Sequence, residues 1–269
     1  MGHERVRVLR GRGCRECIVV AETIEEFLCT AARSGLDVPD EVVVEAFETH
    51  SLLEPRLEAE ARSIGAAYGG VRPESCVLYA GWTGLPQVYV VLSACRGLDE
   101  KCIRGEAARA AAHSILHRGI DCYVYTINYY YESTLRIILG PLYPAFLYLV
   151  GAGVRGYEAN SLAVRLGYGD LVAVDEVRAL AGAVAALAAL KPARRPRLLI
   201  AAELFKYLAE SRPLARPGSP VLDMLGRLAP LYPAEYNAAL RALAAMEPAS
   251  STAERARLAA EKIIEELLA

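Results

Sequence analysis

Clusters of apolar residues predict short strands in the first third of the chain. Residues 5–20 contain two such segments, R-V-R-V-L and C-I-V-V-A, separated by the turn-prone Gly11-Arg12-Gly13. Two further apolar runs, residues 76–80 and 88–93, are joined by G-W-T-G-L-P, a sequence typical of turns. The pattern therefore predicts a small sheet, with a hairpin over residues 76–93.

Apolar residues at helical spacing dominate the remainder of the chain. This spacing predicts a helix over residues 23–33 and a second from Asp40 to about Ala67, bent at Pro55, whose glutamates mark a solvated face. Asp99 is a good N-cap and Gly119 a good stop, so a helix is expected between them. Gly105 inside that helix predicts a close packing contact, because glycine otherwise weakens a helix.

The chain after Gly156 is helical in pattern almost throughout. The predicted helices span residues 157–166, 174–190, 198–211, 220–228, 233–246 and 252–268. The last is amphipathic and could pack on the body of the protein or on a second copy, so a homo-oligomer remains open. We expect an α+β, predominantly helical protein with a core over residues 1–170 and a helical region over 171–269.

The stretch from Ile137 to Val154 carries no formal charge over 18 residues, the lower edge of membrane-spanning length. Two prolines and three glycines interrupt it, which favours a core helix with irregular ends over a membrane segment. The preceding tyrosine cluster, residues 123–131, could line a groove or pack around a buried helix, and the second interpretation is the simpler one.

Charge and composition narrow the function classes. The 30 basic and 32 acidic residues leave a net charge of -2, so no nucleic-acid-binding surface is indicated. Residues 1–12 are polar and lack the apolar segment of a signal peptide, which favours a cytoplasmic protein. The excess of arginine over lysine and the scarcity of asparagine and glutamine are thermophile-like.

Seven cysteines are spread along the chain, and the expected state in the cytoplasm is mostly free thiols. Cys14 and Cys17 form a C-x-x-C motif, but a zinc site would need a second such pair. The neighbouring I-V-V run predicts a strand, so we interpret these two cysteines as structural thiols rather than a redox or metal site.

The sharpest chemical motif is a histidine pair in the helix expected before Gly119. His113 and His117 are four residues apart, so a helix would project both imidazoles from one face, the spacing by which zinc peptidases hold their metal. Ser114 stands where those enzymes carry the glutamate that activates water. A histidine pair at this spacing also occurs by chance, and ordinary hydrogen-bonded histidines are an equal alternative to metal ligands.

The order of these segments resembles the zincin metallopeptidases, especially the gluzincins and the ImmA/IrrE-type regulators. The shared features are a strand at 88–93, the helix with A-H-x-x-x-H-R, an apolar helix, and then Y-E-A-N-S-L-A-V-R-L-G over residues 157–167. The resemblance implies zinc bound by His113, His117 and a glutamate on the later helix, for which Glu158 is the candidate.

Two departures fall on functional positions. Ser114 cannot accept a proton from metal-bound water as a glutamate does. Alignment of Ala159-Asn160 with the family pattern E-x-x-A-(D/N) places the ligand glutamate at Gly156, and Glu158 lies two residues later, about 200° around a helix. Glu106 lies about 10 Å before His113 along the helix, too far to replace the missing base.

Three functional hypotheses follow. The first is a zincin-like, metal-binding protein that has lost or altered its proteolytic activity. The second is a non-catalytic helical protein that binds a protein or peptide through its C-terminal helices or its tyrosine-rich region. The third is an active zinc metallopeptidase with an unconventional base, which is the weakest because the chemistry normally requires a carboxylate.

Overall fold

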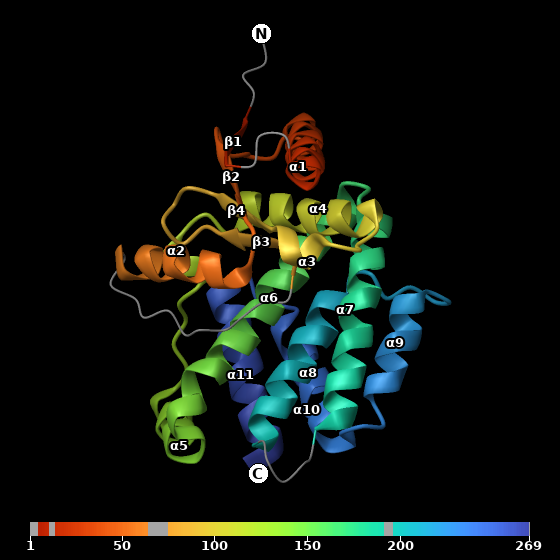
Figure 1. Cartoon of the computed structure of the whole chain (residues 1–269). Helices are drawn as coiled ribbons and strands as arrows, with labels where there is room; N and C mark the ends of the chain where they lie inside the picture. The colour runs from red at the N-terminus through yellow and green to blue at the C-terminus, as the bar shows by residue number, and fades with distance from the viewer. Residues whose placement is uncertain (1–4, 11–13, 64–74, 191–195, 269) are drawn as a thin grey trace. The chain divides into compact units, whose positions relative to one another are not determined.

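The computed structural model describes residues 5–10, 14–63, 75–190 and 196–268 (Figure 1). Contacts divide the chain into two compact units, Met1–Ile120 with Ala159–Asp175, and Asp121–Glu158 with Glu176–Ala269. The chain is α+β and predominantly helical, as predicted. The domain boundary predicted at residue 170 stays a prediction, since units defined by contacts need not fold independently.

The first unit contains a four-stranded mixed sheet. Its strands are β1 (Val6–Arg10), β2 (Val42–Phe47), β3 (Val77–Ala80) and β4 (Gln87–Val91), in the order β1-β2-β4-β3. β2 pairs in parallel with β1 and with β4, whereas β3 pairs antiparallel with β4. The hairpin predicted for residues 76–93 is therefore confirmed, with β3 at the edge of the sheet.

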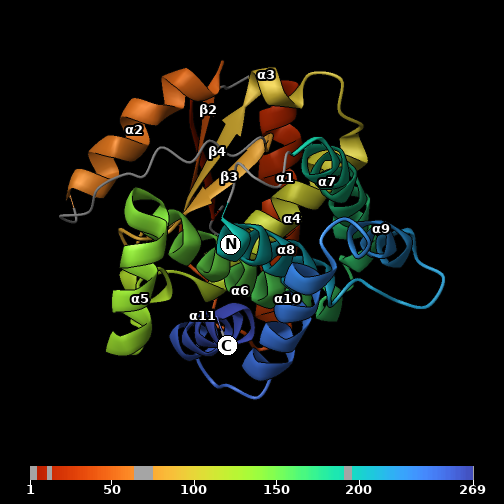
Figure 2. The same cartoon turned by 90° about the horizontal axis from the view of Figure 1, so that it is seen from below.

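Helices cover both faces of this sheet. Figures 1 and 2 place α2 (His50–Ser63) on one side of the strands and α1 (Arg15–Arg33) with α4 (Glu100–Leu116) on the other. On the α2 side, buried side chains from β2, β4 and the helix form one apolar cluster that includes Phe47, Tyr89 and Leu53. On the other side, α1 and α4 pack extensively against each other, and α4 packs against β3.

The strand predicted over C-I-V-V-A is wrong, because these residues lie in α1. Cys14 is the N-cap of the helix, and its Sγ accepts a hydrogen bond from the N–H of Cys17. Apolar residues then recur every three or four positions, from Cys17 through Val20 and Ile24 to Phe27, and all are fully buried. The burial of a whole helical face outweighs the modest preference of isoleucine and valine for strands.

The helix predicted from Asp40 to Ala67 is also wrong in its first part. Residues Val42–Phe47 form β2, which is paired on both sides and almost wholly buried, and the helix begins only at His50. Two glutamates assigned to a solvated face, Glu45 and Glu60, are buried. A run of β-branched residues paired on both edges is typical of a parallel strand, and here it overrides the helical spacing.

Two disulfides correct the expectation of mostly free thiols. Cys14 is bonded to Cys17 at the start of α1, and Cys76 is bonded to Cys95, which ends the short helix α3 (Leu92–Cys95). The remaining three cysteines, Cys29, Cys102 and Cys122, do not belong to these two disulfides.

The second unit is helical. Its elements are α5 (Tyr129–Leu139), α6 (Tyr143–Arg165), α7 (Gly169–Ala189), α8 (Arg197–Ser211), α9 (Pro220–Leu228), α10 (Pro233–Met246) and α11 (Thr252–Leu268), with the 3₁₀ turns η1 (Ile120–Cys122) and η2 (Gly140–Leu142). The last part of α6, from Ala159, and the first part of α7, up to Asp175, belong to the first unit. The last three helices have the predicted bounds.

The uncharged stretch 137–154 forms no single helix. Gly140 has a positive φ of 52° and separates α5 from α6, which continues through the predicted helix at 157–166. Within the described residues, one segment, Tyr129–Arg165, is long enough and apolar enough to cross a membrane. Of its most apolar 18 residues, 39% are buried. Such a stretch is weak evidence for a membrane span, because core helices of soluble proteins have the same composition.

Glycines allow α6 to approach α8 closely within the second unit. A Cβ on Gly153 would lie 2.8 Å from the Cα of Lys206, and one on Gly156 would lie 2.3 Å from the Cγ of Glu210. Gly156 is the position at which the zincin resemblance expects a metal-binding glutamate. Here it makes room for Glu210, which forms an ion pair of 3.2 Å with Lys206.

Candidate functional site

The histidine pair lies where α4 ends. Asp99 caps the start of the helix by accepting the N–H of Lys101, as predicted. His113 is in the last turn, but the helix ends at Leu116, and His117 has the non-helical angles φ -124° and ψ 53°. The expectation that both histidines belong to one helix is therefore wrong for His117, which turns away from the regular i, i+4 geometry.

This turn brings the two rings together. The Nδ1 atoms of His113 and His117 are 2.8 Å apart, and the ring centroids are separated by 4.9 Å. At this separation one Nδ1 carries a hydrogen and donates it to the other, which must be unprotonated. The pair is thus a hydrogen-bonded imidazole couple, and His117 is fully buried whereas His113 is partly exposed.

Strand β3 holds this couple in place. The ring of Tyr79 stacks on His113, with centroids 5.5 Å apart and planes 13° apart. The hydroxyl of Tyr79 also donates a hydrogen bond of 3.0 Å to the carbonyl oxygen of His117. Gly81 makes this arrangement possible, because a Cβ there would lie 2.4 Å from the same carbonyl oxygen and 2.0 Å from the tyrosine hydroxyl.

Gly105, upstream in α4, has the close contact that was predicted. A Cβ at this position would lie 2.4 Å from the carbonyl oxygen of Leu171. Arg109, one turn later, forms a 2.7 Å ion pair with the buried Asp175 of α7. The start of α7 therefore packs on α4 through a glycine contact and a shielded charge pair.

Two residues of α4, Ser114 and Glu106, were considered as the group that would activate water. Ser114 is fully buried, and its hydroxyl donates to the carbonyl oxygen of Ala111 at 2.7 Å. Glu106 is buried as well, and its carboxylate accepts the N–H of Val77 at 2.6 Å. The carboxylate of Glu106 thus fixes the start of β3, and the hydroxyl of Ser114 is hydrogen-bonded to the backbone of its own helix.

The third predicted ligand, Glu158, lies on α6 in the second unit. Its carboxylate accepts a 2.8 Å hydrogen bond from the hydroxyl of Thr252 and forms an ion pair with Arg255, both on α11. Across residues 5–10, 14–63, 75–190 and 196–268, no three His, Cys, Asp or Glu side chains are grouped so as to hold a metal ion. The three-ligand set of His113, His117 and Glu158 is therefore not assembled there, and zinc binding stays a prediction.

A second polar cluster in the first unit was missed from the sequence. It lies between α2 and the sheet and consists of Glu45, Arg56, Glu60, Gln87 and Tyr89. The guanidinium of Arg56 contacts Glu60 at 3.0 Å and Gln87 at 3.0 Å, and the Tyr89 hydroxyl donates to Glu60. Burial, followed by the hydrogen bond and negative charge of Glu60, raises the pKa of Tyr89 far above its ordinary value.

This cluster is a structural network around one buried phenol. Glu45 and Tyr89 are paired across β2 and β4, so their side chains share the face of the sheet that α2 covers. The available signal was in β4, where the polar-headed Gln87 and Tyr89 alternate with Val88 and Val90. Assignment of residues 40–67 to one helix concealed the pairing of Glu45 with Tyr89.

The most exposed apolar surface of the second unit lies on α5. Tyr129, Tyr130 and Ile137 are 83%, 72% and 84% exposed, and Ile138 is also exposed. Leu135 and Leu139 on the opposite side of the helix are buried. The outward face, defined as residues 129, 130, 133, 134, 137 and 138, consists of uncharged residues. Exposed Arg136 lies at its edge, seven residues after Tyr129, and forms a 2.7 Å ion pair with Glu132.

Comparison of the chain with models of protein families, with curated proteins and with solved structures gives no match. The likeness to zincins therefore rests on the order of elements and the quoted residues alone.

Proposed function

We propose that this chain is a non-proteolytic protein with a zincin-like order of elements, and that it binds a partner protein through the outward face of α5. The observation that carries the proposal is the exposure of Ile137, at 84%, about two turns along α5 from two tyrosines that are exposed by more than 70%. Large apolar side chains that are exposed together on one side of a helix are typical of interaction surfaces.

The chemistry of this face specifies the partner. None of its six residues carries a charge, and the charges at its edge, Arg136 and Glu132, are paired with each other. A charged group of the partner at the centre of this face would therefore lose its hydration without gaining a counter-charge. Tyrosine and isoleucine side chains favour an apolar surface with a few hydroxyl or carbonyl groups at its edge. We therefore expect a protein that presents an uncharged, apolar helix or strand.

The lack of proteolysis follows from the residues beside the histidines. Ser114 is bonded to its own helix and cannot take a proton from water, and Glu106 is engaged by the N–H of Val77. A metallopeptidase needs a carboxylate next to the metal-bound water. Neither of these two residues can act as the base beside His113.

A photo-reactive residue at position 137 would identify the partner in cells. The affinity of the purified partner for the purified chain would then be measured by calorimetry. We expect Ile137→Asp to weaken binding at least about tenfold, since it places a charge in an apolar contact. Leu52→Asp is the matched control, because Leu52 is also exposed, at 59%, but lies on α2.

Other results would overturn this proposal. If Ile137→Asp converts a dimer of the chain into a monomer by light scattering, the face joins two copies. If instead the wild type binds neutral phospholipid vesicles and Ile137→Asp does not, the face contacts lipid. Equal binding of the purified partner by both variants would remove α5 from the interface.

Metal binding by the histidine pair is a second candidate, favoured by the convergence of two imidazole nitrogens. Two nitrogens on a tetrahedral zinc ion at about 2.05 Å lie about 3.3 Å apart, so the 2.8 Å separation would have to open by about 0.5 Å. Metal analysis of protein purified without a histidine tag tests this candidate. Less than about a tenth of an equivalent of zinc, unchanged after zinc is added, would reject it.

A further inference from the structure

The C-x-x-C motif lies at the start of a helix that connects two parallel strands. β1 and β2 are paired in parallel, and α1 is the helix between them, with Cys14 as its N-cap and Cys17 in its first turn. A strand prediction for residues 17–21 was the reason to treat these cysteines as structural. The helix removes that reason, because a C-x-x-C in the first turn of such a unit is the arrangement of dithiol redox centres.

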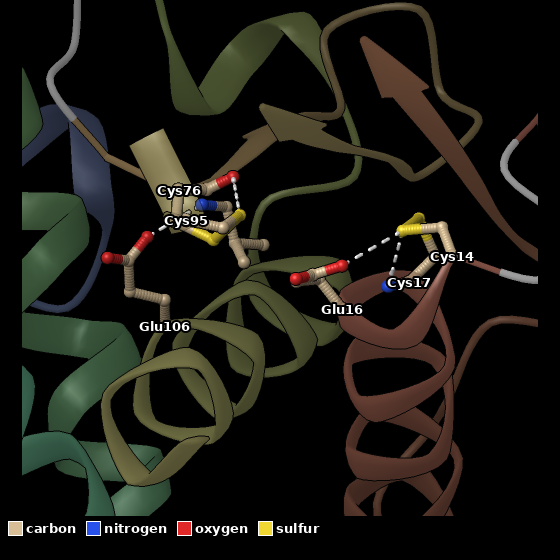
Figure 3. Close-up of a disulfide and its surroundings, with 7 residues drawn as sticks. Cys14, Glu16, Cys17, Cys76, Cys95 and Glu106 are labelled. Carbon is tan, nitrogen blue, oxygen red and sulfur yellow. Dashed lines mark hydrogen bonds between the residues drawn. A yellow bond between two sulfur atoms is a disulfide. The ribbon is translucent and has the colours of Figure 1, made fainter. Parts of the chain in front are cut away.

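The two sulfur atoms of this disulfide differ in accessibility. Cys17 is fully buried, whereas Cys14 is partly exposed. In the second disulfide, Cys76 and Cys95 are both buried. Figure 3 shows both disulfides, with Cys14 and Cys17 at the end of their helix. A thiol from another molecule can therefore reach one sulfur of the first disulfide and neither sulfur of the second.

The short loop of the first disulfide argues against a purely stabilising role. Cys14 and Cys17 are three residues apart, whereas Cys76 and Cys95 are 19 residues apart. A cross-link removes fewer conformations from the unfolded chain when the loop that it closes is shorter. The second disulfide fits a stabilising role, and the first adds comparatively little.

Two polar groups and the helix dipole act on the Cys14 sulfur, and they affect a negative charge there in opposite directions. Its Sγ accepts the N–H of Cys17 at 3.1 Å, and it lies at the positive end of the helix dipole. A carboxylate oxygen of Glu16 is 3.5 Å from the same sulfur. In the reduced state Glu16 can accept the thiol hydrogen of Cys14, and its charge opposes that of a Cys14 thiolate.

We propose that Cys14 and Cys17 form a redox centre that exchanges disulfides with dithiols of peptides or proteins. A substrate thiolate attacks the Sγ of Cys14, a new S–S bond forms there, and the Cys14–Cys17 bond breaks. Cys17 leaves as a thiolate and takes up a proton. The second substrate thiolate then attacks the substrate sulfur of this mixed disulfide and releases Cys14 as a thiolate.

The electrons balance in this sequence. The substrate loses two electrons and becomes a disulfide, and the protein gains them as two reduced cysteines. In the reverse direction the reduced cysteines transfer the same two electrons to a substrate disulfide. The co-reactant in either direction is another thiol or disulfide, and no further oxidant is required.

Glutathione is the probe for the test. Single variants are reduced, incubated with glutathione disulfide and analysed by intact and peptide mass spectrometry. In Cys17→Ser we expect glutathione on Cys14 in most molecules within minutes. In Cys14→Ser we expect Cys17 to react at least about tenfold more slowly, because it is buried. Circular dichroism verifies that both variants are folded.

The wild type and a charge variant complete the test. In the folded wild type, reduced glutathione should open Cys14–Cys17 and leave Cys76–Cys95 intact. Glu16→Gln should make alkylation of reduced Cys14 by iodoacetamide about fivefold faster, because it removes a neighbouring negative charge. The proposal is overturned if the single variants react equally fast, or if Cys14–Cys17 opens only after the protein unfolds.

Discussion

The Nδ1 atoms of His113 and His117 lie 2.8 Å apart, so each imidazole is the other's hydrogen-bond partner. The contact exists because α4 ends at Leu116 and the backbone of His117 leaves the helix. A regular helix would point both rings in similar directions, toward a shared ligand. The same two residues are instead directed at each other, which is why the motif is compatible with a structural role.

Removal of this hydrogen bond should destabilise the protein. His113→Phe keeps a ring to stack on Tyr79 but deprives the buried His117 of its Nδ1 partner. We expect the free energy of unfolding in urea to fall by about 1–2 kcal/mol. His113→Asn, whose amide can still exchange a hydrogen bond there, should cost less, and equal losses in both variants would contradict this account.

A side chain at Gly81 should disrupt the support of the histidine pair from β3. In Gly81→Ala the new methyl group would overlap the Tyr79 hydroxyl and the His117 carbonyl oxygen. We expect a loss of about 1–3 kcal/mol in denaturant unfolding, typical of overpacking. Gly119→Ala is the control, because a Cβ at Gly119 would have no atom within 4 Å.

The charge of Glu158 should matter for stability and not for metal content. Its partner Arg255 is mostly buried, so Glu158→Gln leaves a poorly solvated guanidinium without its counter-charge. The expected loss is about 2–4 kcal/mol in denaturant unfolding. The zinc content of the purified protein should be unchanged. If the Glu158→Gln protein is stable but contains less zinc than the wild type, the result would support Glu158 as a zinc ligand.

Buried tyrosine should make the protein sensitive to alkali. The pKa of Tyr89 is raised in the folded state by burial and by Glu60, whereas in the unfolded chain it is about 10. Above pH 10 the unfolded state loses this proton and the folded state keeps it, so stability falls as pH rises, by up to about 1.4 kcal/mol per pH unit.

Tyr89→Phe tests this dependence. Other tyrosines with raised pKa values, among them Tyr125 and Tyr207, contribute to the same decline, so the variant should reduce the slope of stability between pH 10 and 11 without removing it. Tyr129→Phe, at an 83% exposed position, is the control. A slope that is the same in Tyr89→Phe and in the wild type would contradict the burial argument.

Helices with strong end signals could be predicted from the sequence, and strands flanked by weak signals could not. Asp99, Pro220 and Pro233 bound helices that the structure confirms, because caps and prolines act locally. β2 was missed because its stability comes from pairing with β1 and β4, which lie far away in the sequence. The choice between strand and helix at Cys17 depended likewise on the packing of α1 against α4 and the sheet.

The candidate site shows the same limit. The spacing of His113 and His117 correctly brought the two residues together, but the direction of their rings depends on where α4 ends and on Tyr79 of the edge strand. Glu158 was chosen by resemblance, and its carboxylate is engaged by Thr252 and Arg255 on a helix nearly 100 residues later. Such long-range partners have no local signature in the sequence.

The two disulfides should differ in their contribution to stability, whatever the chemistry of the first. Loop closure gives about 3 kcal/mol for the 19-residue separation of Cys76 and Cys95, and about 2 kcal/mol or less for Cys14 and Cys17. Cys76→Ser/Cys95→Ser also places two hydroxyl groups in the core, which increases its cost. Thermal unfolding should therefore give a larger drop in Tm for this double variant than for Cys14→Ser/Cys17→Ser. A larger drop in Tm for Cys14→Ser/Cys17→Ser would contradict this expectation and would show that the first disulfide stabilises the start of α1. The rates at which Cys17→Ser and Cys14→Ser react with glutathione disulfide would then decide whether disulfide exchange occurs there as well.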